Sequence, residues 1–102
     1  MIKSKINISG FKIGTAENRK ELTGVTVILA PDGGATAGVD VRGCAPGTRE
    51  TDLLDPRKTV QKIHAVVLSG GSAFGLEAAL GCVNYLAEQG VGFPIGNVCV
   101  PI

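Results

Sequence analysis

The chain has 102 residues, which suffices for one small domain, and its hydrophobic share of 44% excludes a disordered tail. Ten basic and nine acidic side chains give a formal net charge of +1, and their scattered placement argues against nucleic acid or a membrane surface as a partner. No stretch reaches the roughly 20 apolar residues of a membrane span, and the N-terminus MIKSKINISG is too polar for a signal peptide.

The first third of the chain predicts short strands. In chain order they are a weak edge strand at 2–8, a strand or loop at 10–16, a solvated turn at 17–22 and a clear strand at 23–30. Pro31-Asp32-Gly33-Gly34 has the composition of a hairpin turn. We therefore expect residues 35–42 to return as a strand with a small Ala/Gly face.

Charged side chains gather in the middle of the chain. Residues 43–55 are irregular in pattern, and 56–61 suggest a short helical turn. Thr48, Arg49 and Glu50 can contact a substrate or another loop, and a solvated surface loop explains them equally well. Asp40 and Arg42 share one face of the expected return strand, as a buried or interfacial pair or as plain surface charges.

A strand, a tight turn and a helix follow between residues 63 and 90. The nearly all-apolar run 63–68 is typical of a strand buried on both faces, and Ser69, Gly70, Gly71 and Ser72 then permit a sharp reversal. Helical spacing begins at Ala73, and its apolar stripe consists of Leu76, Leu80, Val83 and Ala87, widened by Ala79 and Leu86. Gly90 is a plausible C-cap. We expect free backbone N–H groups at Ser69–Ser72, which can hold an anion or an oxyanion.

No complete catalytic set is present in the sequence. Ser72 almost matches the G-x-S-x-G nucleophile elbow, but the last glycine is displaced to Gly75, so a helix N-cap or turn role is favoured. The only histidine, His64, lies in an apolar strand, where a packed and hydrogen-bonded ring is the usual case. Cys44, Cys82 and Cys99 form no CxxC pair, so we expect no metal site and reduced thiols in a cytoplasmic protein.

The end of the chain predicts an incomplete domain. Residues 91–102 carry no charge, and Val98, Val100 and Ile102 alternate like a strand that joins a core. We expect residues 1–102 to be a single incomplete domain, either a fragment of a longer polypeptide or one of two chains that fold together. A small anion-binding or assembly module and an inactive truncated remnant are the alternatives.

Several motifs together resemble one enzyme family. The runs VRGCAPGTRETDLL and LSGGSAFGL, with GFPIG and VPI near the end, are similar to the N-terminal portion of the DmpA-type aminopeptidases. That family includes L-aminopeptidase/D-esterases, β-peptidyl aminopeptidases and nylon-oligomer hydrolases, and the similarity covers about residues 10–102.

The resemblance implies an α/β (α+β) chain that is part of a four-layer αββα sandwich, similar in layering to the N-terminal-nucleophile hydrolases. It implies a self-cleaving precursor whose nucleophile is a new N-terminal Ser or Thr downstream of this chain, with no metal or cofactor. It also implies peptide or amide substrates, the remainder of the precursor or a second processed chain as partner, and a homo-oligomer, commonly a tetramer. Leu68, Ser69, Gly70, Gly71 and Ser72 should line the active-site cleft and supply backbone donors to the oxyanion.

Overall fold

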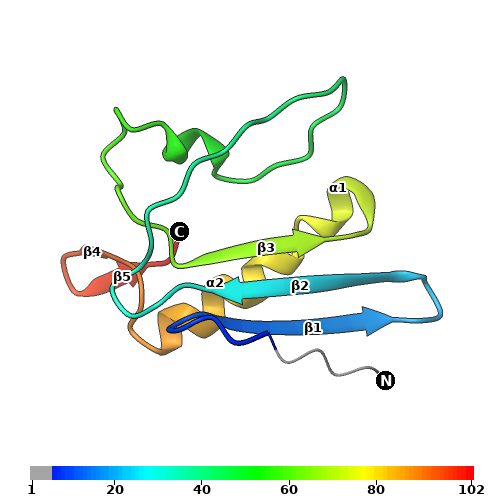
Figure 1. Ribbon diagram of the computed structural model, residues 1–102, viewed down its shortest axis with the longest axis horizontal. Coiled ribbons are helices and arrows are strands. Elements are labelled where there is room, and N and C mark those ends of the chain that lie inside the picture. The colour runs from blue at the N-terminus through cyan, green and yellow to red at the C-terminus, as the bar shows by residue number, and fades with distance from the viewer. Residues whose placement is uncertain (1–5) are drawn as a thin grey trace.

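The computed structural model describes residues 6–102, which form a mixed α/β structure with antiparallel sheets (Figure 1). One sheet has the strand order β1-β2-β3, and a separate hairpin pairs β4 with β5. The strands are β1 (Lys12–Asn18), β2 (Thr23–Leu29), β3 (Ala65–Ser69), β4 (Phe93–Ile95) and β5 (Val98–Val100). The helices are the 3-10 turn η1 (Thr51–Leu54), the single turn α1 (Ser72–Gly75) and α2 (Ala78–Glu88). The mixed α/β (α+β) class expected from the sequence is confirmed.

The hairpin of β1 and β2 follows the sequence pattern closely. The predicted strand at 23–30 is β2, and the strand or loop at 10–16 is a strand that continues to Asn18, so the turn is shorter than expected. The expected edge strand at 2–8 lies in part outside the described residues, and residues 6–8 are not in a strand.

The expected return strand at 35–42 is wrong. The Pro31–Gly34 turn does form, with the Gly34 N–H donating to the Pro31 carbonyl at 2.9 Å, but only one bridge, between Ala35 and Ile63, follows it. The partner of β2 is instead β3, which lies 35 residues further along the chain. A Val/Leu-rich run has a higher strand preference than an Ala/Gly-rich one, and it takes the single free edge of β2. Residues 30–64 become a long loop that extends away from the sheet (Figure 1).

The hydrogen bonds at both ends of β3 establish which of its backbone groups face β2. The Ala30 N–H donates to the His64 carbonyl, and the Gly70 N–H donates to the Gly24 carbonyl, each at 2.9 Å. Hydrogen-bonded pairs alternate along an antiparallel ladder, so Val66 and Leu68 also face β2. The N–H and C=O groups of Ala65, Val67 and Ser69 therefore face the other way, along the outer edge of the sheet.

The expectation that β3 is buried on both faces is wrong for this chain. Ala65, Val67 and Ser69 are half-buried, whereas Val66 and Leu68 are 39% and 58% exposed. Helix α2 packs against β3 and lies behind the sheet in Figure 1. It covers one face only, which leaves the side chains of the opposite face in solvent.

The predicted helix is divided in two and ends as expected. Of the predicted apolar stripe, Leu86 is buried at 5% exposure, whereas Leu80 and Ala87 are exposed. Helix α2 ends in a Schellman motif: the Gly90 N–H donates to Ala87 and the Val91 N–H donates to Leu86, with Gly90 at φ +69°. Gly90 is thus the left-handed residue that closes the helix.

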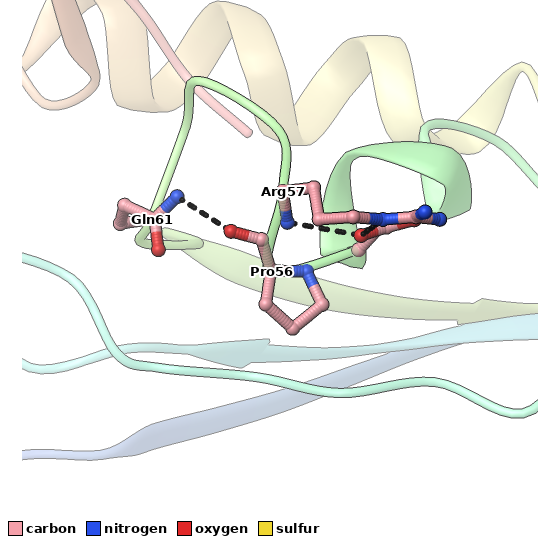
Figure 2. A network of polar contacts seen from close by, with 4 residues as sticks. Pro56, Arg57 and Gln61 are labelled. Carbon is pink, nitrogen blue, oxygen red and sulfur yellow. Dashed lines mark hydrogen bonds and ion pairs between the residues drawn. The ribbon is translucent and has the colours of Figure 1, made fainter.

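A polar network fixes the loop between η1 and β3 (Figure 2). The Asp55 carboxylate accepts from Arg57 Nη2 at 2.6 Å and from Arg57 Nε at 3.0 Å, which lowers the pKa of Asp55 to about 2. Gln61 Nε2 donates to the Lys58 carbonyl at 2.6 Å and to the Pro56 carbonyl at 3.4 Å. Side chains thus hold residues 56–61 as turns and bends, and the short helical turn expected there is absent.

Within residues 6–102, no helix is long and apolar enough to cross a membrane.

Candidate functional site

A groove of about 520 Å³ runs along the outer edge of β3. Helix α2 forms one side of it, through Ala79, Val83 and Leu86, together with Leu76 from the link between α1 and α2. The long loop forms the other side, through residues 37–39 and 47–51. The groove therefore collects segments that are separated by up to 65 positions in the sequence (Ala37 to Ile102).

The groove unites two of the motifs that the sequence analysis singled out. Thr48, Arg49 and Glu50 line it, and so do Leu68 and Ser69 from the end of β3. The Thr48 and Thr51 hydroxyls lie 2.9 Å apart, and Glu50 adopts a left-handed conformation at φ +60° immediately before η1. A non-glycine residue at positive φ is a local strain that the surrounding loop must hold in place.

Gly70, Gly71 and Ser72 lie just past the groove and do not line it. They form the turn between β3 and α1, with Gly71 at φ +93° and Ser72 at φ +60°. Gly71 holds the N-cap position, so of the two roles expected for Ser72, N-cap or turn residue, the turn role is the one observed. Two consecutive left-handed residues turn the chain sharply, and this geometry replaces the side-chain cap.

Fewer backbone N–H groups are free in this turn than the sequence suggests. The Gly70 N–H is used by the Gly24 carbonyl of β2. Within residues 6–102, the N–H groups of Gly71 and Ser72 have no acceptor. The donors available to an anion or an oxyanion are therefore those of Gly71 and Ser72, together with the outward-facing N–H of Ser69.

Close packing explains the glycines of this turn. A Cβ on Gly70 would lie 2.7 Å from Thr23 Oγ1, and a Cβ on Gly75 would collide with the Gly70 carbonyl oxygen. Thr23 Oγ1 is itself buried without a hydrogen-bond partner among the described residues. No sequence pattern marks Thr23, because its contact with Gly70 exists only when β2 pairs with β3.

His64 is a packed, hydrogen-bonded histidine, as expected. It is 7% exposed, its Nδ1 accepts the Ile102 N–H at 3.1 Å, and burial lowers its pKa. It precedes β3, whereas Ser72 follows it, so about 17 Å of strand lies between them. The structure therefore forms no Ser–His pair from these two residues.

Of the remaining polar candidates, Cys82 lines the groove, whereas Asp40, Arg42, Cys44 and Cys99 do not. Asp40 and Arg42 form an ion pair at 2.7 Å whose side chains are largely exposed, which matches the surface alternative. Cys44, Cys82 and Cys99 are free thiols, and burial raises the pKa of Cys82. In the part of the chain that the structure describes, no group of three His, Cys, Asp or Glu residues could hold a metal ion.

Comparison with known proteins identifies the family. A profile described as Peptidase family S58 matches residues 5–101. Uncharacterized aminopeptidases of Mycobacterium tuberculosis and Mycobacterium leprae are each 53% identical over 79 residues, or 78% of this chain, and the match covers 23% and 22% of those proteins. A 6-aminohexanoate-oligomer endohydrolase of Paenarthrobacter ureafaciens is 36% identical over 85 residues, which are 83% of this chain and 21% of that enzyme.

The chain spans less than a quarter of the length of these curated relatives. The profile nevertheless covers both the loop that carries Thr48–Glu50 and the β3 turn that ends in Ser72. These two segments also carry the motifs on which the DmpA-type resemblance depends. Because the family model matches nearly the whole chain, the chain is a member of peptidase family S58, a family of peptidase-type hydrolases.

Proposed function

We propose that this chain forms one wall of the active site of a self-processing amide hydrolase, whose nucleophile lies outside these 102 residues. The relatives named as aminopeptidases and as a 6-aminohexanoate-oligomer endohydrolase support amide-bond hydrolysis as the reaction. The observation that carries the proposal is the groove, because it gathers Thr48–Glu50 and Leu68–Ser69 from distant parts of a family S58 sequence.

Each segment has a distinct role in this proposal. Leu68–Ser72 borders the cleft, and the acceptor-free N–H groups of Gly71 and Ser72 donate to the oxyanion that forms when the amide carbonyl is attacked. Backbone donors suit this task because they are fixed before the reaction starts. Thr48, Arg49 and Glu50, on the opposite side, contact the substrate or hold the loop that does so.

The catalytic residue in this proposal is an N-terminal Ser or Thr that self-cleavage exposes. Its own α-amino group acts as the base that accepts the hydroxyl proton, so the reaction needs no metal or organic cofactor. The substrate is a peptide or a similar amide. The complete enzyme is a cytoplasmic homo-oligomer, a tetramer by the family resemblance, with this chain as part of a four-layer αββα sandwich.

The intact mass of the purified enzyme under denaturing conditions tests this proposal first. We expect two polypeptides, one of them beginning with Ser or Thr when its N-terminal sequence is determined, because self-cleavage creates that terminus. A single active species without such a terminus contradicts the mechanism. A single inactive species of about 10.4 kDa favours the anion-binding module or the inactive remnant, and phosphate binding by calorimetry then separates those two.

A further inference from the structure

The outer edge of β3 presents hydrogen-bonding groups in strand geometry. The backbone groups of Ala65, Val67 and Ser69 face this edge, and β3 is the last strand of the sheet. One of these groups is already used, since the Ala65 N–H donates at 3.2 Å to the Ile102 carbonyl, which also accepts the His64 N–H at 2.7 Å. A chain at this position therefore makes the first hydrogen bond of a new ladder on β3.

The position of Ile102 gives the direction of that ladder. An antiparallel strand starting there would have to run toward Ile63, but both backbone groups of Ile63 are bonded to Ala35, at 2.9 Å each. The opposite direction, along Val67 to Ser69, is open. In a parallel pair, the carbonyl of residue j on one strand accepts the N–H of residue i on the other strand. The N–H of residue j+2 then donates to the carbonyl of the same residue i. The Ile102–Ala65 bond fits this pattern, and Ile102 lies at the start of β3 in Figure 1.

Apolar side chains lie on both faces of β3 beside this edge, as is typical of a strand that has a neighbouring strand on each side. Val66 and Leu68 are exposed on one face of β3, and the apolar stripe of α2 lines the groove on the other. An exposed, apolar sheet edge is an aggregation hazard that native proteins normally cover. The relatives are more than four times as long as the matched segment, so their polypeptides contain ample additional chain.

We propose that the outer edge of β3 binds an extended apolar strand from the remainder of the enzyme's polypeptide, parallel to β3 and in line with Ile102. Such a strand occupies the part of the groove beside Ala65–Ser69 and turns β3 from an edge strand into an interior one. It leaves the Gly71–Ser72 turn open at the end of the sheet. The inference rests on the proposed function's assumption that the enzyme has polypeptide beyond these residues, and it leaves the N–H groups of Gly71 and Ser72, without that of Ser69, as the oxyanion donors.

Amide hydrogen exchange on the complete enzyme, resolved to single residues, tests the assignment. We expect the Val67 and Ser69 amides to be protected to within about tenfold of Val66 and Leu68, which pair with β2 and serve as internal references. Exchange of Val67 and Ser69 at the rate of an unprotected loop amide would overturn the proposal. Protection that disappears when the enzyme is diluted until it is monomeric would also overturn the proposal. In that case a second copy of the enzyme, and not a strand of the same copy, covers the edge.

A proline substitution gives an independent readout. The Val67 N–H faces the outer edge, so Val67→Pro removes a hydrogen bond only if that edge is paired. We expect Val67→Pro to lower the unfolding temperature of the complete enzyme about as much as Val66→Pro, whose N–H faces β2, with Val67→Ala as the control for side-chain loss. A Val67→Pro enzyme as stable as Val67→Ala contradicts the proposal. An enzyme without amidase activity but with a protected edge contradicts the proposed function alone.

Discussion

Backbone conformation, more than side-chain chemistry, decides what Gly71 and Ser72 contribute. Both are left-handed, at φ +93° and +60°, and only glycine adopts such angles without strain. Strain of this kind costs roughly 1–3 kcal/mol for a residue with a side chain and persists where the surrounding structure enforces it. The turn therefore depends on glycine at position 71 and holds Ser72 in a strained conformation.

Substitutions at these two positions separate a scaffold role from a nucleophilic one. We expect Gly71→Val to abolish amidase activity of the complete enzyme, because a β-branched residue at φ +93° displaces the donor N–H groups. We expect Ser72→Ala to reduce kcat only modestly. Steady-state kinetics and circular dichroism on both variants check this. A folded Ser72→Ala enzyme that loses several orders of magnitude in kcat would identify Ser72 as the nucleophile instead.

The contact between Gly70 and Thr23 gives a second prediction at this scale. Gly70→Ala places a methyl group 2.7 Å from Thr23 Oγ1, and we expect it to destabilise the enzyme by about 1–3 kcal/mol. Adding Thr23→Ala should restore most of that stability, because the hydroxyl it removes has no hydrogen-bond partner.

Urea unfolding of the two single variants and the double variant measures this coupling. Gly14→Ala is the matched control, since a Cβ there meets nothing within 4 Å. Additive effects of the two substitutions would show that Gly70 and Thr23 do not restrict each other.

At the scale of elements, local sequence patterns predicted the individual strands and the helix end. Pairing between distant segments determined how the strands are arranged in the sheet. The strand at 23–30 and the helix stop at Gly90 depend on neighbouring residues, so the sequence alone predicts them. The return strand at 35–42 failed because its competitor β3 lies 35 positions away. The site was predictable in part: Leu68, Ser69 and the Thr48–Glu50 loop share a groove, but no local pattern reveals that α2 completes it.

The connection between β3 and the end of the chain depends on a titratable ring. His64 Nδ1 accepts the Ile102 N–H, which requires a neutral imidazole, and burial holds the pKa of His64 below its ordinary 6.5. The unfolded chain then binds more protons than the folded one between that lowered pKa and 6.5. The stabilisation is complete above pH 6.5 and is lost as the pH falls through the folded-state pKa.

Chemical unfolding of the enzyme across pH 4–8 checks this dependence. We expect the free energy of unfolding to decrease below about pH 6.5. In His64→Gln that contribution should disappear, because the amide does not titrate, while any contribution from carboxylates remains. An identical pH profile in the two proteins would show that His64 does not couple protonation to folding.

The whole molecule exposes more surface than its mass predicts. Its accessible area is 8003 Å², against about 5,400 Å² for a folded monomer of this mass. Its radius of gyration is 14.5 Å, against about 12.8 Å for a compact chain of this length. Among residues 6–102, only His64, Leu86 and Pro101 are buried. These values show that the described residues bury little of their surface against one another.

The long loop between β2 and β3 is anchored where it leaves and re-enters the sheet. The Ala30–His64 hydrogen bond and the Ala35–Ile63 bridge fix both ends, whereas the residues between them carry the Thr48–Glu50 side of the groove. Doubling the length of a flexible loop costs only about 0.6 kcal/mol in closure entropy. Insertions and deletions in this loop can therefore reshape one side of the groove while the sheet stays unchanged. In evolutionary terms, the shape of the groove can diversify through loop length at little cost in stability.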